Sequence, residues 1–136
     1  MSETVDKLFM AATQARKNAY APYSHFMVGA AVATESGQIF AGANVEEAAY
    51  KTICAEAAAI ANMVTHIGRH RIAEVMVVGG AENDGRLVTP CGHCRQYLRE
   101  HMAGEMKIHV AGPEGLRKTF TLEELLPYSF GPENLK

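Results

Sequence analysis

The chain has 136 residues, of which 48% are hydrophobic and 21% are charged, and its formal net charge is −2. This length fits a single domain over residues 1–136, and the composition is typical of a globular protein rather than a disordered one. The small net charge offers no basic surface for a nucleic acid polymer. No apolar run approaches the roughly 20 residues of a membrane helix and no leader pattern is present, so we expect a cytoplasmic protein that does not bind membranes.

The first half of the chain predicts a helix, a β-hairpin and a second helix. Apolar residues recur at helical spacing over residues 4–20. Residues 27–33 and 39–45 read as two strands, and the turn residues between them predict a hairpin. The segment 54–63 has high helix propensity, and we expect this helix to end near Gly68.

The second half predicts strands that alternate with short helices. The apolar run 74–80 is typical of a strand covered on both faces. A third helix is expected to start at Pro90, because proline costs no hydrogen bond in a first turn. Strands follow at 107–111 and 117–120, and residues 121–124 match a capping box for a last short helix. This order predicts an α/β domain with three layers, α/β/α, around a mixed sheet.

The three cysteines of the chain lie in two short motifs at predicted helix starts. Residues 54–56 read Cys-Ala-Glu, and residues 90–94 read Pro-Cys-Gly-His-Cys. Three thiolates, from Cys54, Cys91 and Cys94, occupy three corners of a tetrahedral zinc site and leave the fourth open. An open position is typical of catalytic zinc, whereas structural sites close all four. The positive ends of helices also favour thiolates.

Glu56 is the predicted catalytic residue of this site. It lies two residues after the ligand Cys54, near enough to reach a water at the open position without binding the metal. A carboxylate there accepts and delivers protons, while zinc makes the water acidic. Glutamate in a first helical turn is otherwise an ordinary partner of the helix dipole, so its place beside a ligand is what makes Glu56 a candidate.

Two other protein classes use parts of the same pattern. The Cys-Gly-His-Cys segment at 91–94 alone also matches a thiol–disulfide redox motif. A noncatalytic zinc module would instead close the fourth position with one of the six histidines. The redox class does not need the Cys-Ala-Glu segment at 54–56, and none of the histidines has the spacing of a zinc module. Zinc content together with ammonia release separates the three classes.

The two motifs together resemble the zinc-dependent cytidine deaminases, and the all-cysteine ligand set resembles their small, homotetrameric members. The similarity extends over almost the whole chain, through residues 21–26, 28–31, 44–46, 94–96 and 125–127. It implies Zn²⁺ as the cofactor and hydrolytic deamination of cytidine, deoxycytidine or a related small cytosine nucleoside. The products would be the uridine-type nucleoside and ammonia, which places the reaction in pyrimidine salvage.

The resemblance also implies substrate-binding residues. They are Phe26 on the pyrimidine, Asn44 and Glu46 on the ribose hydroxyls, Ala55 on the base edge through its backbone, and Phe130. In homotetrameric members an aromatic residue after the Leu-Leu-Pro segment reaches the site of a neighbouring subunit, and Phe130 matches that position. We therefore expect a homotetramer with shared active sites.

Three positions depart from the family pattern. Ala57 replaces a common arginine, His93 replaces a small residue, and Glu47 replaces a common asparagine. Deaminases of other cytosine-bearing compounds, such as blasticidin-S deaminase, have a basic residue where His93 lies, so such a compound is the alternative substrate. Three thiolates around a divalent ion also leave one net negative charge. We expect His93 to hydrogen-bond a ligand sulfur and offset the missing arginine.

Overall fold

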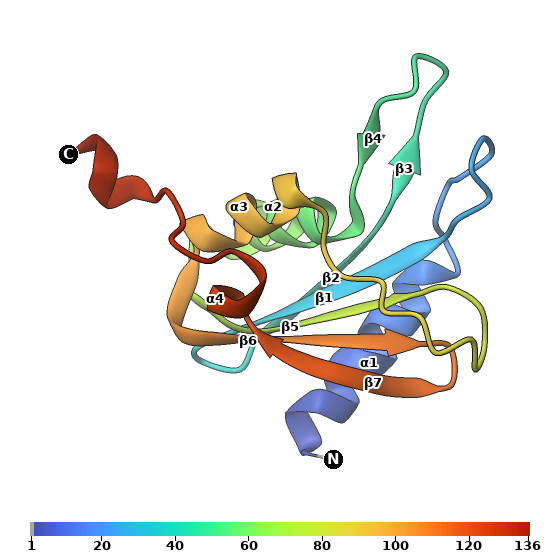
Figure 1. Cartoon of the computed structure of the whole chain (residues 1–136), viewed down its shortest axis with the longest axis horizontal. Helices are drawn as coiled ribbons and strands as arrows, with labels where there is room; N and C mark the ends of the chain where they lie inside the picture. The colour runs from blue at the N-terminus through green and yellow to red at the C-terminus, as the bar shows by residue number, and fades with distance from the viewer. Residues whose placement is uncertain (1) are drawn as a thin grey trace.

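Five strands form one mixed sheet in the computed structural model, which describes residues 2–136 (Figure 1). The strand order across the sheet is β2-β1-β5-β6-β7. The strand bounds are Val28–Thr34 for β1, Ile39–Ala43 for β2, Ile72–Gly79 for β5, Met102–Gly112 for β6 and Gly115–Thr121 for β7. The central strands β5 and β6 pair in parallel, whereas the other three pairs are antiparallel.

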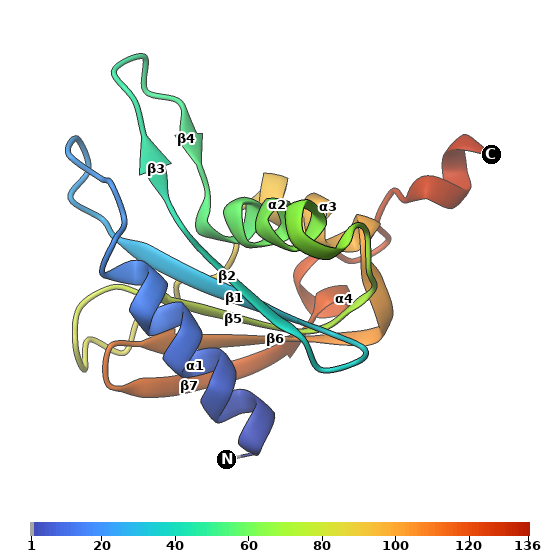
Figure 2. The ribbon, with the colours of Figure 1, turned by 180° about the vertical axis from the view of Figure 1, so that it is seen from behind.

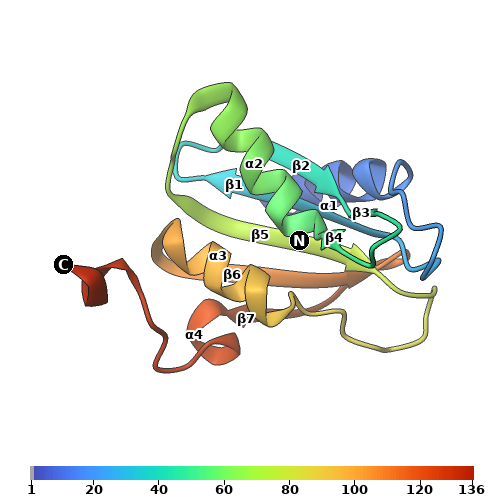
Figure 3. The same cartoon turned by 90° about the horizontal axis from the view of Figure 1, so that it is seen from above.

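Helices cover both faces of this sheet. Helix α1 (Glu3–Arg16) packs against β1, β2 and β5, on the face opposite α2 (Ala55–Ile67) and α3 (Gly92–Glu100) (Figure 2). Seen from above, α2 and α3 lie side by side across the sheet (Figure 3). The chain ends in the short helix α4 (Leu122–Leu125) and the 3-10 helix η1 (Pro132–Leu135). The predicted three-layer α/β/α architecture with a mixed sheet is confirmed.

Two further strands form a small ribbon outside the sheet. They are β3 (Val45–Glu46) and β4 (Thr52–Ile53), which pair antiparallel. The ribbon projects away from the sheet beside the loop that follows α1 (Figure 1). Within residues 2–136, no helix combines the length and the apolar character needed to cross a bilayer.

The hydrophobic core has one part on each face of the sheet. On the face of α2 and α3 it is built by side chains from both helices and the central strands, among them Ile60, Met63, Val75, Val77, Leu98 and Ile108. Under α1 it is built by Leu8, Ala12, Ala31, Met76, Val78 and Ala111. Neighbouring residues of β5 therefore point into different halves of the core. This confirms the prediction of a strand covered on both faces. The two parts of the core fix the helices against the sheet.

The first helix and the second strand end earlier than predicted for one shared reason. Helix α1 ends at Arg16, because the Tyr20 N–H donates to the Asn44 carbonyl at 3.0 Å instead of continuing the helix. The Glu46 N–H in turn donates to the Tyr20 carbonyl at 2.9 Å. Strand β2 consequently ends at Ala43, and the residues after it belong to the ribbon. These are contacts between segments far apart in the sequence, which local patterns do not contain.

The third helix begins later than predicted, and the strand after it is longer. Helix α3 starts at Gly92, with Cys91 as its N-cap, rather than at Pro90. The Pro90 carbonyl accepts a hydrogen bond from the Arg95 side chain, which holds Pro90 in the loop before the helix. Strand β6 extends beyond the predicted residues 107–111, because its first part continues the pairing with β5 past a register shift.

Close contact between β2 and α2 depends on Gly42. A Cβ atom at this position would lie 2.4 Å from the backbone nitrogen of Ala59 and 2.7 Å from the backbone carbonyl carbon of Ala58. Real Cβ atoms do not approach backbone that closely, so only glycine lets the helix lie at this distance from the strand. Since α2 carries Cys54 at its start, Gly42 also helps to fix the position of that thiol.

We expect Gly42→Ala to lower the free energy of unfolding by about 1–3 kcal/mol, because an extra methyl group in a packed contact forces the backbone to shift. Gly92→Ala is the control, since a Cβ there meets no heavy atom within 4 Å. Thermal unfolding at one fixed zinc concentration, followed by circular dichroism, measures both. A Gly42→Ala protein that unfolds at the parent's temperature would contradict the packing described.

Candidate metal centre

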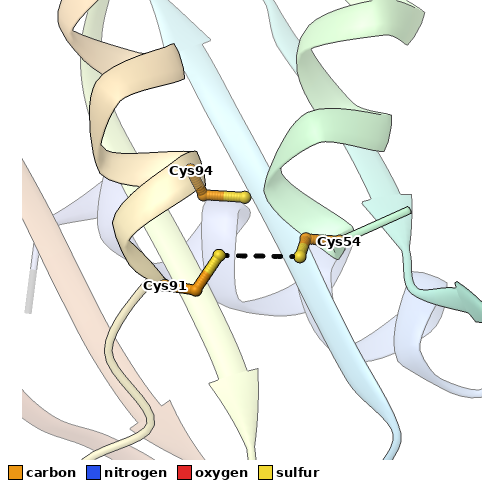
Figure 4. A group of neighbouring side chains, drawn as sticks. All are labelled: Cys54, Cys91 and Cys94. Carbon is orange, nitrogen blue, oxygen red and sulfur yellow. Dashed lines mark hydrogen bonds between the residues drawn. The ribbon is translucent and has the colours of Figure 1, made fainter. Parts of the chain in front are cut away.

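Two helix starts bring the three cysteines together. Cys54 is the N-cap of α2 and Cys91 is the N-cap of α3, and both have extended backbone. Neither thiol makes a capping hydrogen bond, so both side chains are free to point between the helices. Cys94 lies one turn into α3 and faces the same space, and Figure 4 shows the three sulfurs converging from the two helix starts.

The distances between the sulfurs fit a zinc ion. All three Sγ atoms lie within 4.8 Å of one another, and those of Cys54 and Cys91 are 3.7 Å apart. Zinc–sulfur bonds of about 2.3 Å in a tetrahedron place two sulfurs about 3.8 Å apart. All three cysteines are free thiols. Three soft sulfur donors at this separation therefore match zinc in both chemistry and spacing.

The three cysteines differ in how far they are buried. Cys94 is buried, Cys54 is partly buried and Cys91 is exposed. The cluster is thus anchored on its Cys94 side in the core and reachable from solvent on its Cys91 side. Three donors gather in this cluster, whereas a structural zinc site closes all four positions with protein ligands.

The ionisation of the thiols also points to a cation. Burial, followed by the hydrogen bond and the charge of Cys91, raises the pKa of Cys54 to about 11. Burial and the negative charge of Glu56 raise the pKa of Cys94 still further. Although burial opposes it, hydrogen bonds from the Cys94 backbone and from the neighbouring thiols lower the pKa of Cys91. Three thiolates in this space therefore need a bound metal ion to stabilise them.

Glu56 follows the N-cap Cys54 by two residues, and its charge raises the pKa of the Cys54 and Cys94 thiols. It is the second residue of α2, and it is 4% exposed. Burial raises the pKa of its carboxyl group, while its own backbone N–H lowers it by a smaller amount. The structure thus places a buried carboxyl group in the first turn of the helix that Cys54 caps, and burial favours the protonated form of that group. Ala55, between Cys54 and Glu56, is buried at the start of the helix.

Asn44 connects the segments before and after the first two strands of the sheet. Its Oδ1 accepts a hydrogen bond from the Val28 N–H at 2.9 Å, and its Nδ2 donates to the Phe26 carbonyl at 2.8 Å. The ring of Phe26 is 44% exposed and lines a cavity of about 560 Å³ together with Arg16 and Leu87. Asn44 therefore holds the backbone that carries Phe26, a structural task that the sequence pattern did not indicate.

Glu46 is held by the loop that precedes Phe26. Its carboxylate accepts hydrogen bonds from the backbone N–H groups of Tyr23 and Ser24, each at 3.1 Å, and from the Ser24 hydroxyl. The Ser24 hydroxyl is the main reason why the pKa of Glu46 is lowered. Glu46 lines a second cavity, of about 210 Å³, whose wall includes Tyr50. Phe26 and Glu46 thus line separate cavities in this chain.

Two of the three departures from the family pattern have visible local contacts. The Glu47 carboxylate accepts hydrogen bonds from the Ala49 N–H at 2.7 Å and the Lys51 N–H at 3.2 Å, so it closes the turn of the ribbon. His93 is exposed, with its ring centroid 5.7 Å from that of Tyr97. Within residues 2–136 its side chain makes no hydrogen bond to a cysteine sulfur. Its expected contact with a ligand stays a prediction, and the structure gives it no support.

Phe130 lies on the C-terminal tail, which extends from the body of the molecule past α4 (Figure 1). The Gln96 side chain of α3 donates to the Phe130 carbonyl at 2.8 Å. Arg99, one turn later on the same helix, donates to the Ser129 hydroxyl at 2.8 Å and pairs with Glu133. The ring of Phe130 is 56% exposed. Helix α3, which Cys91 caps and which contains Cys94, thus also fixes the backbone at the exposed residue Phe130.

Sequence reasoning missed two groups of residues that hold predicted site residues in place. Ser24 and the Tyr23 backbone hold Glu46, and Arg95 holds the loop before Cys91. Ser24 and Arg95 both stand inside segments that resemble the deaminases. No spacing pattern assigns a task to them, because each acts on residues that are distant along the chain or on backbone carbonyls.

The family described as cytidine and deoxycytidylate deaminase zinc-binding region matches residues 2–110 of this chain. The chain belongs to this family. A cytidine deaminase of Halalkalibacterium halodurans is 38% identical over 129 residues, which cover 94% of this chain and 95% of the relative. A cytidine deaminase of Mycobacterium tuberculosis is 40% identical over 126 residues, which cover 91% of this chain and 87% of the relative.

Solved structures agree with the assignment to this deaminase family. The crystal structure of a cytidine deaminase from Burkholderia pseudomallei matches with a TM-score of 0.83 at 35% identity, covering 96% of this chain and 100% of that chain. The family prediction made from the two cysteine motifs is therefore confirmed, as is the α/β fold. Zinc as the cofactor is also confirmed, by the zinc-binding region of the family and by the cluster of Cys54, Cys91 and Cys94.

We expect purified protein to hold about one zinc ion per chain, because the three thiols form one donor set. Replacing both Cys91 and Cys94 with alanine removes two donors and should abolish zinc retention through gel filtration. His66→Ala is the control, since that exposed histidine lies at the far end of α2. Metal analysis measures all three proteins. Full retention of zinc in the double variant would exclude these ligands.

Proposed function

We propose that the chain is a zinc-dependent aminohydrolase that converts cytidine or deoxycytidine to the uridine-type nucleoside and ammonia. The observation that carries this proposal is the convergence of three cysteine sulfurs at two adjacent helix starts, one of which carries the buried Glu56 in its first turn. These helix starts then supply metal ligands and a proton-transferring group. Membership of the deaminase family supports the same conclusion.

The proposed reaction replaces the 4-amino group of cytosine with oxygen from water. Cys54, Cys91 and Cys94 hold the zinc ion, which when bound makes a water molecule acidic enough to act as the nucleophile at neutral pH. Glu56 accepts one proton of the water as the water oxygen bonds to C4, and delivers it to the ring nitrogen N3. It then accepts the second proton of that oxygen and delivers it to the leaving amine. The C4–nitrogen bond breaks and ammonia leaves. Burial raises the pKa of Glu56, which suits a carboxyl group that must hold a proton and release it.

The proposed substrate contacts follow the family resemblance. The Phe26 ring packs on the pyrimidine, which its exposure permits. The backbone of Ala55 contacts the base edge, and its position in the first turn of α2 supports this, because first-turn N–H groups lack partners within the helix. Asn44 and Glu46 bind the ribose. Each keeps lone pairs beyond its present hydrogen bonds, and the Asn44 amide keeps one N–H.

We further propose that residues 1–136 act as one domain in a cytoplasmic homotetramer. Free cysteines fit a reducing compartment. Apolar side chains are exposed on the ribbon, where Tyr50 is 84% and Ile53 is 56% exposed. Exposed apolar groups on a projecting element are typical of surfaces that another chain covers. Phe130 on the tail would then complete the substrate site of a neighbouring subunit.

An assay of ammonia release tests the proposed function. The substrates are cytidine, deoxycytidine, cytosine nucleosides with altered sugars, and the antibiotic blasticidin S. We expect zinc-dependent ammonia release from cytidine or deoxycytidine. Release from blasticidin S alone would favour the alternative substrate class. Disulfide reduction by metal-free protein without any ammonia release would favour a redox protein.

We expect Glu56→Gln to keep zinc and fold while turnover falls by about 10²–10⁴-fold, because the amide cannot transfer protons. Glu105→Gln is the matched control, since Glu105 is an exposed residue of β6. The comparison uses kcat for ammonia release under zinc saturation, with metal analysis of each protein. Turnover of Glu56→Gln at the parent's rate would remove Glu56 from the mechanism, and loss of zinc would indicate a ligand instead.

We expect Phe130→Ala to raise KM for the nucleoside several-fold while each chain keeps its zinc, because Phe130 is proposed to contact substrate across a subunit boundary. Tyr128→Ala is the control, since Tyr128 is a fully exposed aromatic residue on the same tail. Steady-state kinetics and sedimentation measure the effect and the assembly. An active monomer at assay concentration, or a Phe130→Ala enzyme with the parent's kinetics, contradicts the shared site.

A further inference from the structure

The Arg95 side chain uses the three nitrogens of its guanidinium group on three neutral oxygens. Its Nε donates to the Pro90 carbonyl at 2.7 Å, and its Nη2 donates to the Thr89 hydroxyl at 3.0 Å. Its Nη1 donates to the Leu125 carbonyl, at the end of α4, at 2.7 Å. The side chain is partly buried, and within residues 2–136 it pairs with no carboxylate. An arginine bonded in this way holds neighbouring segments of the chain in place, unlike a solvated arginine on the surface.

Two of these three oxygens belong to the residues immediately before Cys91. The Pro90 carbonyl is part of the peptide group that joins Pro90 to Cys91, so the bond from Arg95 sets the orientation of that peptide plane. The bond to Thr89 fixes the residue before it. Arg95 itself follows Cys94 on α3. One side chain therefore ties the backbone of Cys91 to the helical turn that carries Cys94.

Cys91 needs this restraint more than the other two cysteines do. Cys94 is buried inside α3, and Cys54 is partly buried at the start of α2, whereas Cys91 is exposed. The Cys91 thiol also makes no capping hydrogen bond with its own helix. Packing thus holds Cys54 and Cys94 in place, whereas Cys91 depends on its backbone conformation and on the contact between its sulfur and that of Cys54.

We propose that Arg95 is a positioning residue of the metal centre, which fixes Cys91 so that its sulfur stays within bonding distance of the shared ion. This inference rests on the proposed function, because it takes Cys91 as a zinc ligand. The planar guanidinium is essential to it. A fork of N–H groups at fixed angles reaches Thr89, Pro90 and Leu125 at once, whereas the single ammonium group of lysine does not reproduce that geometry.

The test measures zinc release from the holoenzyme into an excess of a chromogenic chelator. Outer contacts that orient metal ligands typically contribute about 10–100-fold to metal affinity. We expect Arg95→Met and Arg95→Lys to release zinc at least about tenfold faster than the parent. The control is Arg99→Met, which removes a guanidinium of the same helix that bonds Ser129 and Glu133 instead of the loop. It should release zinc at the parent's rate.

Thr89→Val supplies a milder variant that removes one of the three acceptors and should also accelerate zinc release. It carries the test if the Arg95 variants do not fold, as judged by circular dichroism. Release at the parent's rate from folded Arg95→Met, or from Thr89→Val in its place, overturns the inference. So does parental zinc retention by Arg95→Lys, or equal acceleration by Arg99→Met. A parent protein that binds no zinc overturns the proposed function and, with it, this inference. A parent that binds zinc, together with a folded Arg95→Met that releases zinc at the parent's rate, overturns this inference alone, so the two failures are distinguishable.

Discussion

The metal centre depends on a topological constraint, which is that two helices must begin at the same end of strand β5. Helix α2 precedes β5 and runs back along the sheet, so its start lies near the end of that strand. Helix α3 follows β5 and begins near the same end, before the chain crosses to the parallel strand β6. Cys54 and Cys91, 37 residues apart in the sequence, meet there with their sulfurs 3.7 Å apart. The burial of the centre and the pKa values of its side chains depend on this proximity.

Burial at the two helix starts affects the ionisation of two of the thiols and of the Glu56 carboxyl group in the same direction. It raises the pKa values of Cys54, Cys94 and Glu56 together, because each would otherwise bring negative charge into a space with little water. A divalent cation removes this penalty for the thiols, so metal loading and thiol deprotonation are coupled. In the proposed mechanism Glu56 is not a metal ligand. Its proton therefore remains available for chemistry.

The sequence was sufficient for those parts of the molecule that depend on local chemistry. The capping box formed by Thr121 and Glu124 is present in the structure, and Gly68 caps α2 where the predicted helix was expected to end. The Cys-Ala-Glu and Pro-Cys-x-x-Cys motifs indicated the three cysteines that the structure brings together, because each motif stands close to a helix start.

The features that local patterns did not indicate are contacts between distant segments. The bridge between Tyr20 and Val45 ends two predicted elements early. The ribbon β3–β4 has strands of two residues each, which are too short to show a period. Arg95 reaches the Leu125 carbonyl 30 residues further along the chain. Hydrogen bonds from side chains to backbone carbonyls do not depend on the identity of the accepting residue, so no motif records them.

The hydrogen bonds of Asn44 carry a consequence for enzyme engineering. Its amide binds the backbone of Phe26 and Val28, and the Tyr20 N–H binds its carbonyl. Under the proposed roles, the residue that recognises the sugar therefore also sets the position of the ring that recognises the base. Libraries that vary Asn44 to widen sugar tolerance would change base affinity in the same clones. Selectivity for the two halves of a nucleoside cannot evolve independently at that position, and Glu46 shares this constraint, because the Ser24 hydroxyl that donates to its carboxylate also accepts from the Phe26 N–H.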